Sequence, residues 1–415
     1  MAKSISIAAL VFSMSLSVCV PAHADAVTDW NAVTLSCVQG PPNPPNRGGP
    51  PGLLDIALVQ AAVHDAVQAI QGRFESYHYE NAGLRGVGSP SAAAAAAAYG
   101  VLVGLYGADD PCLATVADPA VTHAGDPGLQ AGTEAAAALL PLYRPFFVLP
   151  TDPFVGGTGP GEWRPTPGVT AGANTWMAKT APFVLNRPSQ FRPEPPPPLK
   201  SESYRRDYDE VKALGSLTGS ARTAEQTDLA RFWSGNPIAM WFGVVRSVAD
   251  ANVPDVGDKA RLLALVALAA ADSQISVYDT KYDYNFWRPI TAIREGDADG
   301  NPRTGGDATW TPFLVTPPYP DHSSGANNLS GSITTILRLH FGTDEMDFAI
   351  SSGVAGLTVN PRTYERFSAA ADDVVEVRIL QGIHFRFADE LGRRQGSRIA
   401  HWAFQNFLKP LPDVK

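Results

Sequence analysis

Three short segments in the C-terminal half of this 415-residue chain carry side chains that suit the binding of an anion. They are Lys281 and Arg288 in KYDYNFWRP, His322, Ser324 and Gly325 in PPYPDHSSGANNLSG, and Arg378 and His384 in VRILQGIHFRFADE. Lysine and arginine are rarely buried unless their charge is paired. Because the first two cations lie among aromatic residues, the sequence indicates a partner anion that the chain itself does not supply.

The residue types fit a tetrahedral oxyanion, whose oxygens each accept hydrogen bonds. Lys281, Arg288 and Arg378 supply positive charge and N–H donors, and Ser324 supplies a hydroxyl. Gly325 has no Cβ, so a ligand can approach its backbone N–H. The helix predicted to follow directs its positive dipole end to the same place.

The imidazole of His384 is suited to a different task. Its nitrogen lone pair can attack the central atom of such an anion as a nucleophile or bind that atom as a ligand. Arg378 and His384 are six residues apart, which does not place them on one stripe of a continuous helix. We expect them to converge if Gly382, between them, bends the backbone.

Each segment taken alone has a simpler interpretation. Cations in an aromatic-rich segment often reach the surface with their stems buried, and a Ser-Gly pair before a helix is often an N-cap. A histidine between Ile383 and Phe385 is often a satisfied core residue. The three segments together, in this order, are far more specific for an anion site.

The elements that must position these residues are predicted to be mainly helices. Apolar residues recur at helical spacing over 53–71, and the alanine run of 89–107 follows a serine that can cap it. Alternating strand patterns are scarce, and further helical patterns occur at 204–216, 221–233, 258–287, 326–342 and in the C-terminal run to 407.

The segment 143–200 is dense in proline and glycine, yet Phe, Trp and Val recur throughout it. We expect a long ordered loop over the helical core that forms one wall of a cleft. The apolar stretch RLLALVALAAAD (261–272) is shorter than a bilayer span, so we expect a core helix there and no stable membrane span.

The overall charge limits the partners. A net charge of −9 and a pI of about 5.4 argue against a general nucleic-acid binder, although they allow a small basic pocket. A small-molecule substrate fits this balance better. The apolar helices also permit a homodimer.

The N-terminus, MAKSISIAALVFSMSLSVCVPAHADA, combines a lysine, a short apolar stretch and the small residues Ala22 and Ala24. This pattern is typical of a secretory signal of residues 1–24, which predicts a secreted or periplasmic mature protein of residues 25–415. An uncleaved anchor or a buried first helix is the alternative. Cys37 and Cys112 remain after cleavage, and they either form a disulfide or stay separate as buried thiols.

The three segments resemble the motifs of the superfamily of vanadium-dependent haloperoxidases and type 2 phosphatidic-acid and acid phosphatases. KYDYNFWRP matches its Lys-x6-Arg-Pro motif, and VRILQGIHFRF keeps its Arg-to-His spacing with a Gly-Ile-His core. GTGPGEWRPTP (157–167), PSQFRPEPPPPL and YNFWRPITAIR are similar to the bacterial secreted haloperoxidase-like branch.

The resemblance covers about Trp30 to Leu408. It implies one mainly α domain over 25–415, with a helical-bundle core and long Pro/Gly-rich ordered loops. Its parts are the N-terminal helices of 53–107, the Pro-rich region of 143–200 and the oxyanion-site half of 258–408.

The resemblance also assigns roles to residues. In the family, the residues that correspond to Lys281, Arg288, Ser324, Gly325 and Arg378 bind vanadate or phosphate. The final histidine, here His384, bonds vanadium in the peroxidases and becomes phosphorylated in the phosphatases. Five-coordinate vanadate with an apical nitrogen has the shape of the phosphoryl-transfer transition state, so one pocket can serve both reactions.

One departure concerns proton transfer. SSGA (323–326) stands where the family has Pro-Ser-Gly-His, so Ala326 replaces the histidine that acts as acid and base. His322, four residues earlier, either reaches the pocket as a substitute acid or caps the loop.

Other departures concern the support of the site. Val377 replaces the serine that precedes the family's arginine, and Ala388 stands where an aspartate often orients the ligand histidine. We expect Asp389 or a backbone carbonyl to orient His384 instead.

The resemblance therefore predicts a vanadium-dependent haloperoxidase-like enzyme that binds vanadate as cofactor and activates peroxide for halide oxidation. A metal-free acid phosphatase that attacks a phosphate ester through His384 is one alternative. A non-catalytic protein that only binds an oxyanion is another, because Ala326 lacks the acid.

Overall fold

The computed structural model describes residues 25–40, 49–114, 116–143 and 153–412. Within these ranges the chain is mainly helical, as the sequence predicts, and carries one small two-stranded sheet. Its α-helices are α1 (Ala26–Gln39), α2 (Gly52–Gln71), α3 (Pro90–Tyr106), α4 (Pro119–Thr122), α5 (Gly128–Leu139), α6 (Glu202–Leu214), α7 (Ala224–Phe232), α8 (Pro237–Asn252), α9 (Val256–Tyr284), α10 (Pro289–Arg294), α11 (Gly325–Phe341), α12 (Phe367–Leu380) and α13 (Arg386–Asn406). The predicted signal segment lies outside the described residues.

The central element is α9, which is buried on all sides over most of its length. Asp255 caps its start by accepting a hydrogen bond from the N–H of Asp258, and the helix ends at Asn285 in a left-handed conformation. Such all-round burial is typical of the core helix of a large protein. The core helix predicted for 261–272 is therefore confirmed. Both α2 and α9 are long and apolar enough to cross a membrane, but the most apolar stretch of each is wholly buried inside the protein.

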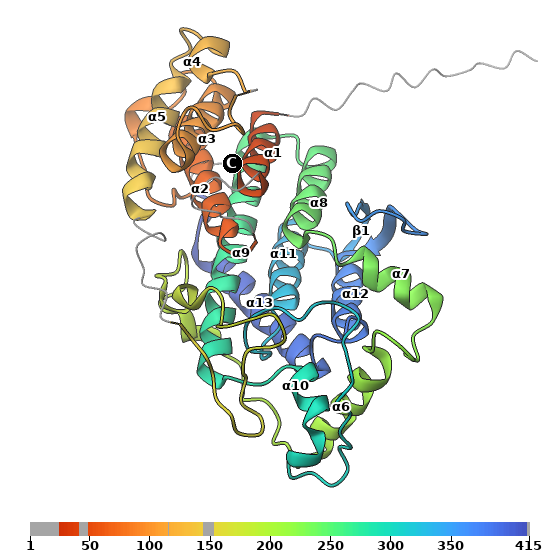
Figure 1. The fold of residues 1–415 in the computed structure, drawn as a ribbon. Coiled ribbons are helices and arrows are strands. Elements are labelled where there is room, and N and C mark those ends of the chain that lie inside the picture. Colours follow the sequence, from red (N-terminus) through yellow and green to blue (C-terminus); the bar gives the residue numbers. More distant parts are fainter. Residues whose placement is uncertain (1–24, 41–48, 115, 144–152, 413–415) are drawn as a thin grey trace, which may run out of the picture.

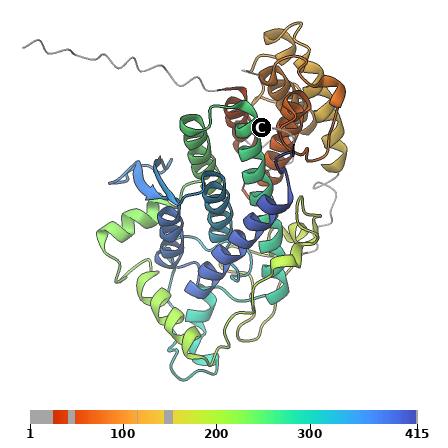
Figure 2. The same cartoon turned by 180° about the vertical axis from the view of Figure 1, so that it is seen from behind.

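Around α9 the helices form a bundle (Figure 1). Helices α11 and α13 pack beside it, and α12 packs against these two. Figure 2 shows α13, in the deepest blue, crossing the back of the bundle obliquely. The N-terminal helices α2, α3 and α5 pack at one end of α9, and α6 and α10 lie at the other end. One cluster of buried hydrophobic side chains runs from Val27 to Leu408, so the N-terminal helices share a core with the C-terminal half.

The N-terminal helices are also joined covalently. A disulfide links Cys37, near the end of α1, to Cys112, in the loop after α3. Of the two arrangements that the sequence allows, linked cysteines are therefore the one found.

Residues 153–200 follow an irregular but ordered path over the bundle, as predicted for the Pro-rich region; 144–152 lie outside the described residues. Trp163 is fully buried, and Phe154 stacks edge-on against Tyr282 of α9. The buried carboxylate of Asp272, also on α9, accepts three hydrogen bonds from the backbone N–H groups of residues 183–185. These contacts fix the loop against the central helix.

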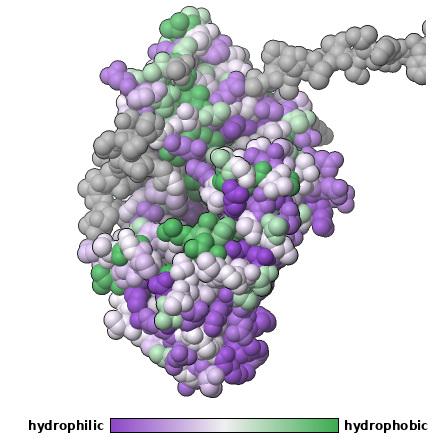
Figure 3. Space-filling model, turned by 45° about the vertical axis from the view of Figure 1, so that its right-hand side comes forward, coloured by the Kyte–Doolittle hydropathy of each residue, from purple (hydrophilic) through white to green (hydrophobic). Residues whose placement is uncertain are grey.

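The sheet pairs β1 (Glu345–Ile350) with β2 (Arg362–Arg366) in antiparallel fashion and lies at the edge of the bundle. On the face shown in Figure 3, most of the surface is polar, and hydrophobic side chains gather near its centre beside a hollow.

Candidate active site

Two of the predicted cations meet on one short backbone segment, residues 319–321. Lys281, in the last turn of α9, donates from Nζ to the carbonyl oxygens of Pro320 and Asp321, both at 2.9 Å. Arg288, which precedes α10, donates from Nε to the carbonyl of Tyr319 at 2.8 Å. Both cations also lie 5.1 Å from the centre of the Tyr319 ring, and both are buried.

His384 joins this group from the turn between α12 and α13. Its Nδ1 lies 2.7 Å from Oδ1 of Asp321, and its Nε2 lies 3.1 Å from Nη1 of Arg288. Gly382 makes the approach possible: its φ is 76°, and a Cβ there would collide with the carbonyl of Gly215. The bend that the sequence analysis required at Gly382 is therefore present.

The group that orients His384 is the carboxylate of Asp321 rather than Asp389 or a backbone carbonyl, the two predicted alternatives. Asp389 instead accepts a hydrogen bond from Asn327 at 2.8 Å and also bonds the Ser324 hydroxyl. The sequence signal for Asp321 was its place directly before His322 in the segment 319–325 that leads into α11, which we call the anion loop. A histidine whose Nδ1–H is held by a carboxylate keeps its lone pair on Nε2, and here that nitrogen faces Nη1 of Arg288.

The start of α11 brings Ser324 and Gly325 to the site. Ser324 is the N-cap residue, but its side chain does not cap the helix, so N–H groups of the first turn have no acceptor within the helix. A Cβ added to Gly325 would make only ordinary contacts, the nearest at 3.4 Å from Gln274. Packing alone therefore does not require glycine here, whereas a ligand that approaches the N–H would.

Arg378 of α12 supplies the third cation. Its Nη1 donates to Oε1 of Gln381 at 2.8 Å. Burial lowers the pKa of its guanidinium, and nearby Asp389 opposes that shift. Its buried Nε has no hydrogen-bond partner, and neither does Nη2 of Arg288. Buried donors are normally satisfied, so these two atoms indicate that an acceptor from outside the chain completes the site.

The electrostatics of the cluster point the same way. Burial, together with the charge of Arg288, holds the pKa of Lys281 well below its ordinary value. Burial and the charges of Arg288, Lys281 and Arg378 likewise lower the pKa of His384. Burial raises the pKa of Asp321 to about 7. Burial also raises the pKa of Asp389 well above its ordinary value. The burial of Lys281 and Arg378 thus disfavours their charged forms, and a bound anion would stabilise those forms.

A cavity of about 580 Å³ opens beside this cluster. Its lining includes Gly325, Ala326, Arg378 and Tyr319, so the position of the missing histidine faces open space. His322 is not among the lining residues. Its Nε2 lies 3.0 Å from the carbonyl of Glu194, and its ring packs against aromatic neighbours. The geometry thus gives no support to His322 as the substitute acid.

The buried amide of Gln395, on α13, holds the anion loop from behind. Its Oε1 accepts from the hydroxyl of Ser323 and from Nδ2 of Asn328, both at 2.8 Å. Its Nε2 donates to the hydroxyls of Ser276 and Thr280 on α9, at 2.9 and 3.0 Å. One side chain therefore ties α13 to α9 and to the start of α11, three of the helices around the site.

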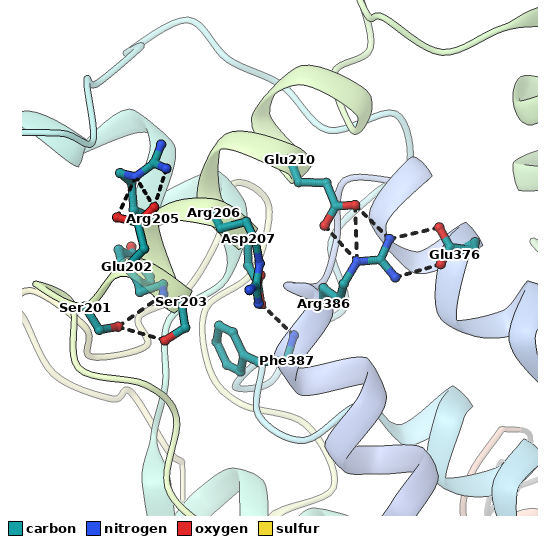
Figure 4. A network of polar contacts seen from close by, with 11 residues as sticks. Ser201, Glu202, Ser203, Arg205, Arg206, Asp207, Glu210, Glu376, Arg386 and Phe387 are labelled. Carbon is teal, nitrogen blue, oxygen red and sulfur yellow. Dashed lines mark hydrogen bonds and ion pairs between the residues drawn. The ribbon is translucent and has the colours of Figure 1, made fainter.

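The start of α13 is fixed from the other side by α6 (Figure 4). The carboxylate of Asp207 accepts from the N–H of Phe387 at 2.9 Å. Arg386 lies between Glu210 of α6 and Glu376 of α12 and pairs with both. Because His384 is only two residues from Arg386, these contacts also restrict the backbone that carries the imidazole.

Comparison with known proteins finds relatives of this chain among the vanadium haloperoxidases. Residues 261–411, which contain every predicted anion-binding residue, match the family model of the VCPO second helical-bundle domain. The chain is 27% identical over 281 residues to vanadium chloroperoxidase from Curvularia inaequalis, an alignment of 55% of this chain and 45% of that protein. The first bacterial vanadium-dependent iodoperoxidase superposes with a TM-score of 0.74 at 25% identity, over 94% of this chain and 97% of that one.

The chain belongs to the vanadium haloperoxidase superfamily. A holo-type bacterial vanadium-dependent chloroperoxidase shares the fold as well, with a TM-score of 0.69 at 17% identity over 92% of this chain and 97% of that one. The alignment to the fungal chloroperoxidase spans about half the length of that enzyme. The family and the helical-bundle fold predicted from the sequence are thus confirmed.

Within this haloperoxidase-like chain, the structure gathers Lys281, Arg288 and His384 around Asp321, with Ser324 at the start of the adjoining helix. Arg378 lines the cavity beside this group. The residues that sequence reasoning missed are Asp321, which orients His384, and the supporting amide of Gln395.

Proposed function

We propose that this protein is a vanadium-dependent haloperoxidase that uses hydrogen peroxide to oxidise a halide. The observation that carries the proposal is the pair of buried, partnerless guanidinium nitrogens on Arg288 and Arg378, next to a histidine whose other nitrogen is held by Asp321. This arrangement supplies donors for an oxyanion and one nitrogen lone pair.

The donor set fits vanadate. Lys281, Arg288, Arg378 and the Ser324 hydroxyl would bind its oxygens together with the N–H of Gly325, and His384 would provide the nitrogen ligand. Vanadate, when bound, supplies a Lewis acid that activates peroxide. The chain's own part is to neutralise the negative charge with fixed cations and to hold Nδ1 of His384 through Asp321.

Vanadate binding is tested directly by adding orthovanadate to the purified protein and measuring the thermal unfolding midpoint and the vanadium-51 resonance. A ligand at 100 times its Kd stabilises the folded protein by about 2.7 kcal/mol. Lys281→Met removes one charge-assisted donor, worth about 1.5–3 kcal/mol, so we expect Kd to rise roughly 10- to 100-fold. Lys212→Met, at a half-buried lysine of α6 that donates to the carbonyl of Gly305 and lies outside the site, is the matched control and leaves Kd unchanged.

The reaction is then followed as triiodide formed from iodide and peroxide. Vanadate binding without triiodide would favour the non-catalytic oxyanion-binding protein. The observation in favour of that alternative is Ala326, which lines the cavity and cannot transfer a proton. Hydrolysis of p-nitrophenyl phosphate with phosphate trapped on His384 would favour the acid phosphatase. Equal vanadate affinity in the Lys281 and Lys212 variants would refute the site itself.

We also infer that the protein acts outside the cytoplasm, in secreted or periplasmic form. The disulfide between Cys37 and Cys112 supports this location, because disulfides persist mainly in oxidising compartments. N-terminal sequencing of exported material should give Asp25 as the first residue; recovery of Met1 would contradict the inference.

A further inference from the structure

Gln274 of α9 is a buried amide beside the predicted anion site. It precedes Lys281 by seven positions, so the two residues lie about two turns apart on one face of the helix. Gln274 is only 3% exposed, and it borders the same cavity as Gly325 and Arg378. Its side chain is therefore part of the wall around the residues that are proposed to bind the anion.

The hydrogen bonds of Gln274 determine which way its amide points. Its Nε2 lies 3.1 Å from the carbonyl oxygen of Gly325 and 3.3 Å from the hydroxyl oxygen of Ser273. A carbonyl oxygen can only accept, and the Ser273 hydroxyl already donates to the carbonyl of Ala270 at 2.7 Å. Both neighbours therefore need a donor, so the NH₂ group of the amide faces them.

The side-chain oxygen of Gln274 is left without a donor. Oε1 accepts no hydrogen bond from the parts of the chain that the structure describes. It lies 3.4 Å from the place where a Cβ of Gly325 would stand. An amide oxygen of a buried side chain normally has a donor, so this atom indicates an O–H group from outside the chain. An anion that binds the N–H of Gly325 could present such a group.

An acceptor at this place distinguishes anions that the cations alone do not. Lys281, Arg288 and Arg378 attract any tetrahedral oxyanion of the same charge. The Oε1 atom of Gln274 repels a bare anionic oxygen, but it binds an oxygen that carries a proton. The chain thus combines donors for charged oxygens with one acceptor for a hydroxyl.

We propose that Gln274 makes this site selective for oxyanions that carry a hydroxyl group, such as vanadate and phosphate, over sulfate. Sulfate has the same tetrahedral shape but no proton, so Oε1 would stay unpaired beside it. Sites built to bond a hydroxyl reject an analogue that lacks one, because a buried polar group is then left without a partner. The proposal rests on the proposed anion site and defines the class of anion that this site accepts.

The test measures phosphate and sulfate binding to vanadate-free protein by calorimetry. At about pH 8, phosphate is mainly a dianion with one proton, so it matches sulfate in charge and shape. We expect phosphate to bind roughly tenfold more tightly than sulfate or better. Gln274→Met keeps the length of the side chain and removes Oε1. It should weaken phosphate binding about tenfold and change sulfate binding less than about twofold.

Two further variants complete the comparison. Gln60→Met is the matched control, because Gln60 is a buried glutamine of α2 outside the cavity whose polar atoms have no hydrogen-bond partner; it leaves both affinities unchanged. Gln274→Glu keeps an acceptor oxygen and adds negative charge, so the ratio of phosphate to sulfate affinity should be at least as large as in the wild type. Circular dichroism establishes that each variant is folded.

Equal affinity of the wild type for phosphate and sulfate would overturn the proposal, and so would selectivity that persists in the Gln274→Met variant. Loss of selectivity in Gln274→Glu would overturn it even if Gln274→Met does not fold. An equal loss of both anions in Gln274→Met would also contradict it, because the amide would then only support the start of α11 through Gly325.

Lys281→Met separates this inference from the site on which it rests. If the site exists, the variant weakens phosphate and sulfate alike. If neither anion binds the wild type, or if Lys281→Met changes neither affinity, the anion site itself is refuted together with the role of Gln274. If both anions depend on Lys281 and yet bind equally well, the role of Gln274 alone is refuted.

Discussion

Replacing the buried amide of Gln395 should destabilise the protein and loosen its anion loop. Gln395→Met keeps the length of the side chain and removes its polar atoms. The hydroxyl of Ser323 and Nδ2 of Asn328 would then lose their shared acceptor inside the core. Each buried donor left unsatisfied costs about 1–3 kcal/mol, which gives roughly 2–6 kcal/mol for the pair.

At about 2 °C per kcal/mol, this cost lowers the thermal unfolding midpoint by roughly 4–12 °C. The matched control is Gln405→Met, because Gln405 is exposed on the same helix, α13. A surface change of this kind is expected to stay within about 0.5 kcal/mol. Both midpoints are measured by circular dichroism in the same buffer, and orthovanadate titration then gives the anion affinity of each variant.

We expect the Gln395 variant to bind orthovanadate about tenfold more weakly at a temperature where it is fully folded. Ser323 directly precedes Ser324, so losing its anchor releases the loop that presents the anion donors. Equal midpoints for the Gln395 and Gln405 variants would refute the argument that the amide network holds the site. A lower midpoint with unchanged vanadate affinity would show that the network supports the core but not the loop.

Three further predictions concern individual ionisable groups. Asp321→Asn should reduce turnover of iodide about 10- to 100-fold with an unchanged circular dichroism spectrum, because the carboxylate orients His384. His322 contacts the carbonyl of Glu194, so His322→Ala should reduce turnover far less than the roughly 100- to 10,000-fold expected from the loss of a general acid. Ala326→His should raise turnover because it adds a group that can transfer a proton. Burial lowers the pKa of His64 to about 4. The unfolded chain therefore binds a proton at His64 before the folded protein does, and the free energy of unfolding falls by about 3 kcal/mol as the pH drops from 6.5 towards 4. His64→Gln should remove this decrease from a plot of unfolding free energy against pH.

The sequence alone predicts much of the fold because its helical periodicity is strong. The long apolar run inside α9 is typical of a helix that is buried on all sides. The alanine-rich run of α3 is typical of a helix that packs in the core. The motif residues Lys281, Arg288 and His384 are identified by type and spacing. Their convergence required only one backbone bend, and the glycine at 382 was visible in the sequence.

The parts that were not predicted depend on contacts between distant segments. Asp321 lies 63 positions before His384, and its role follows from how the anion loop packs under the turn after α12. Gln395 looks like an ordinary polar residue of an amphipathic helix until α9 and α11 surround it. The direction of the His322 ring depends on backbone angles that residue types do not determine.

Anion binding and proton transfer depend on different residues in this pocket, so replacing the family's histidine by Ala326 affects them differently. Anion binding depends on Lys281, Arg288 and Arg378, on the start of α11 and on His384, and none of these contacts involves position 326. Proton transfer does depend on it, and an absent acid costs roughly 100- to 10,000-fold in such a step. The chain should therefore bind vanadate well while turning over slowly at high pH, and it should gain rate as the pH falls and solvent supplies the proton, until the site residues themselves become protonated.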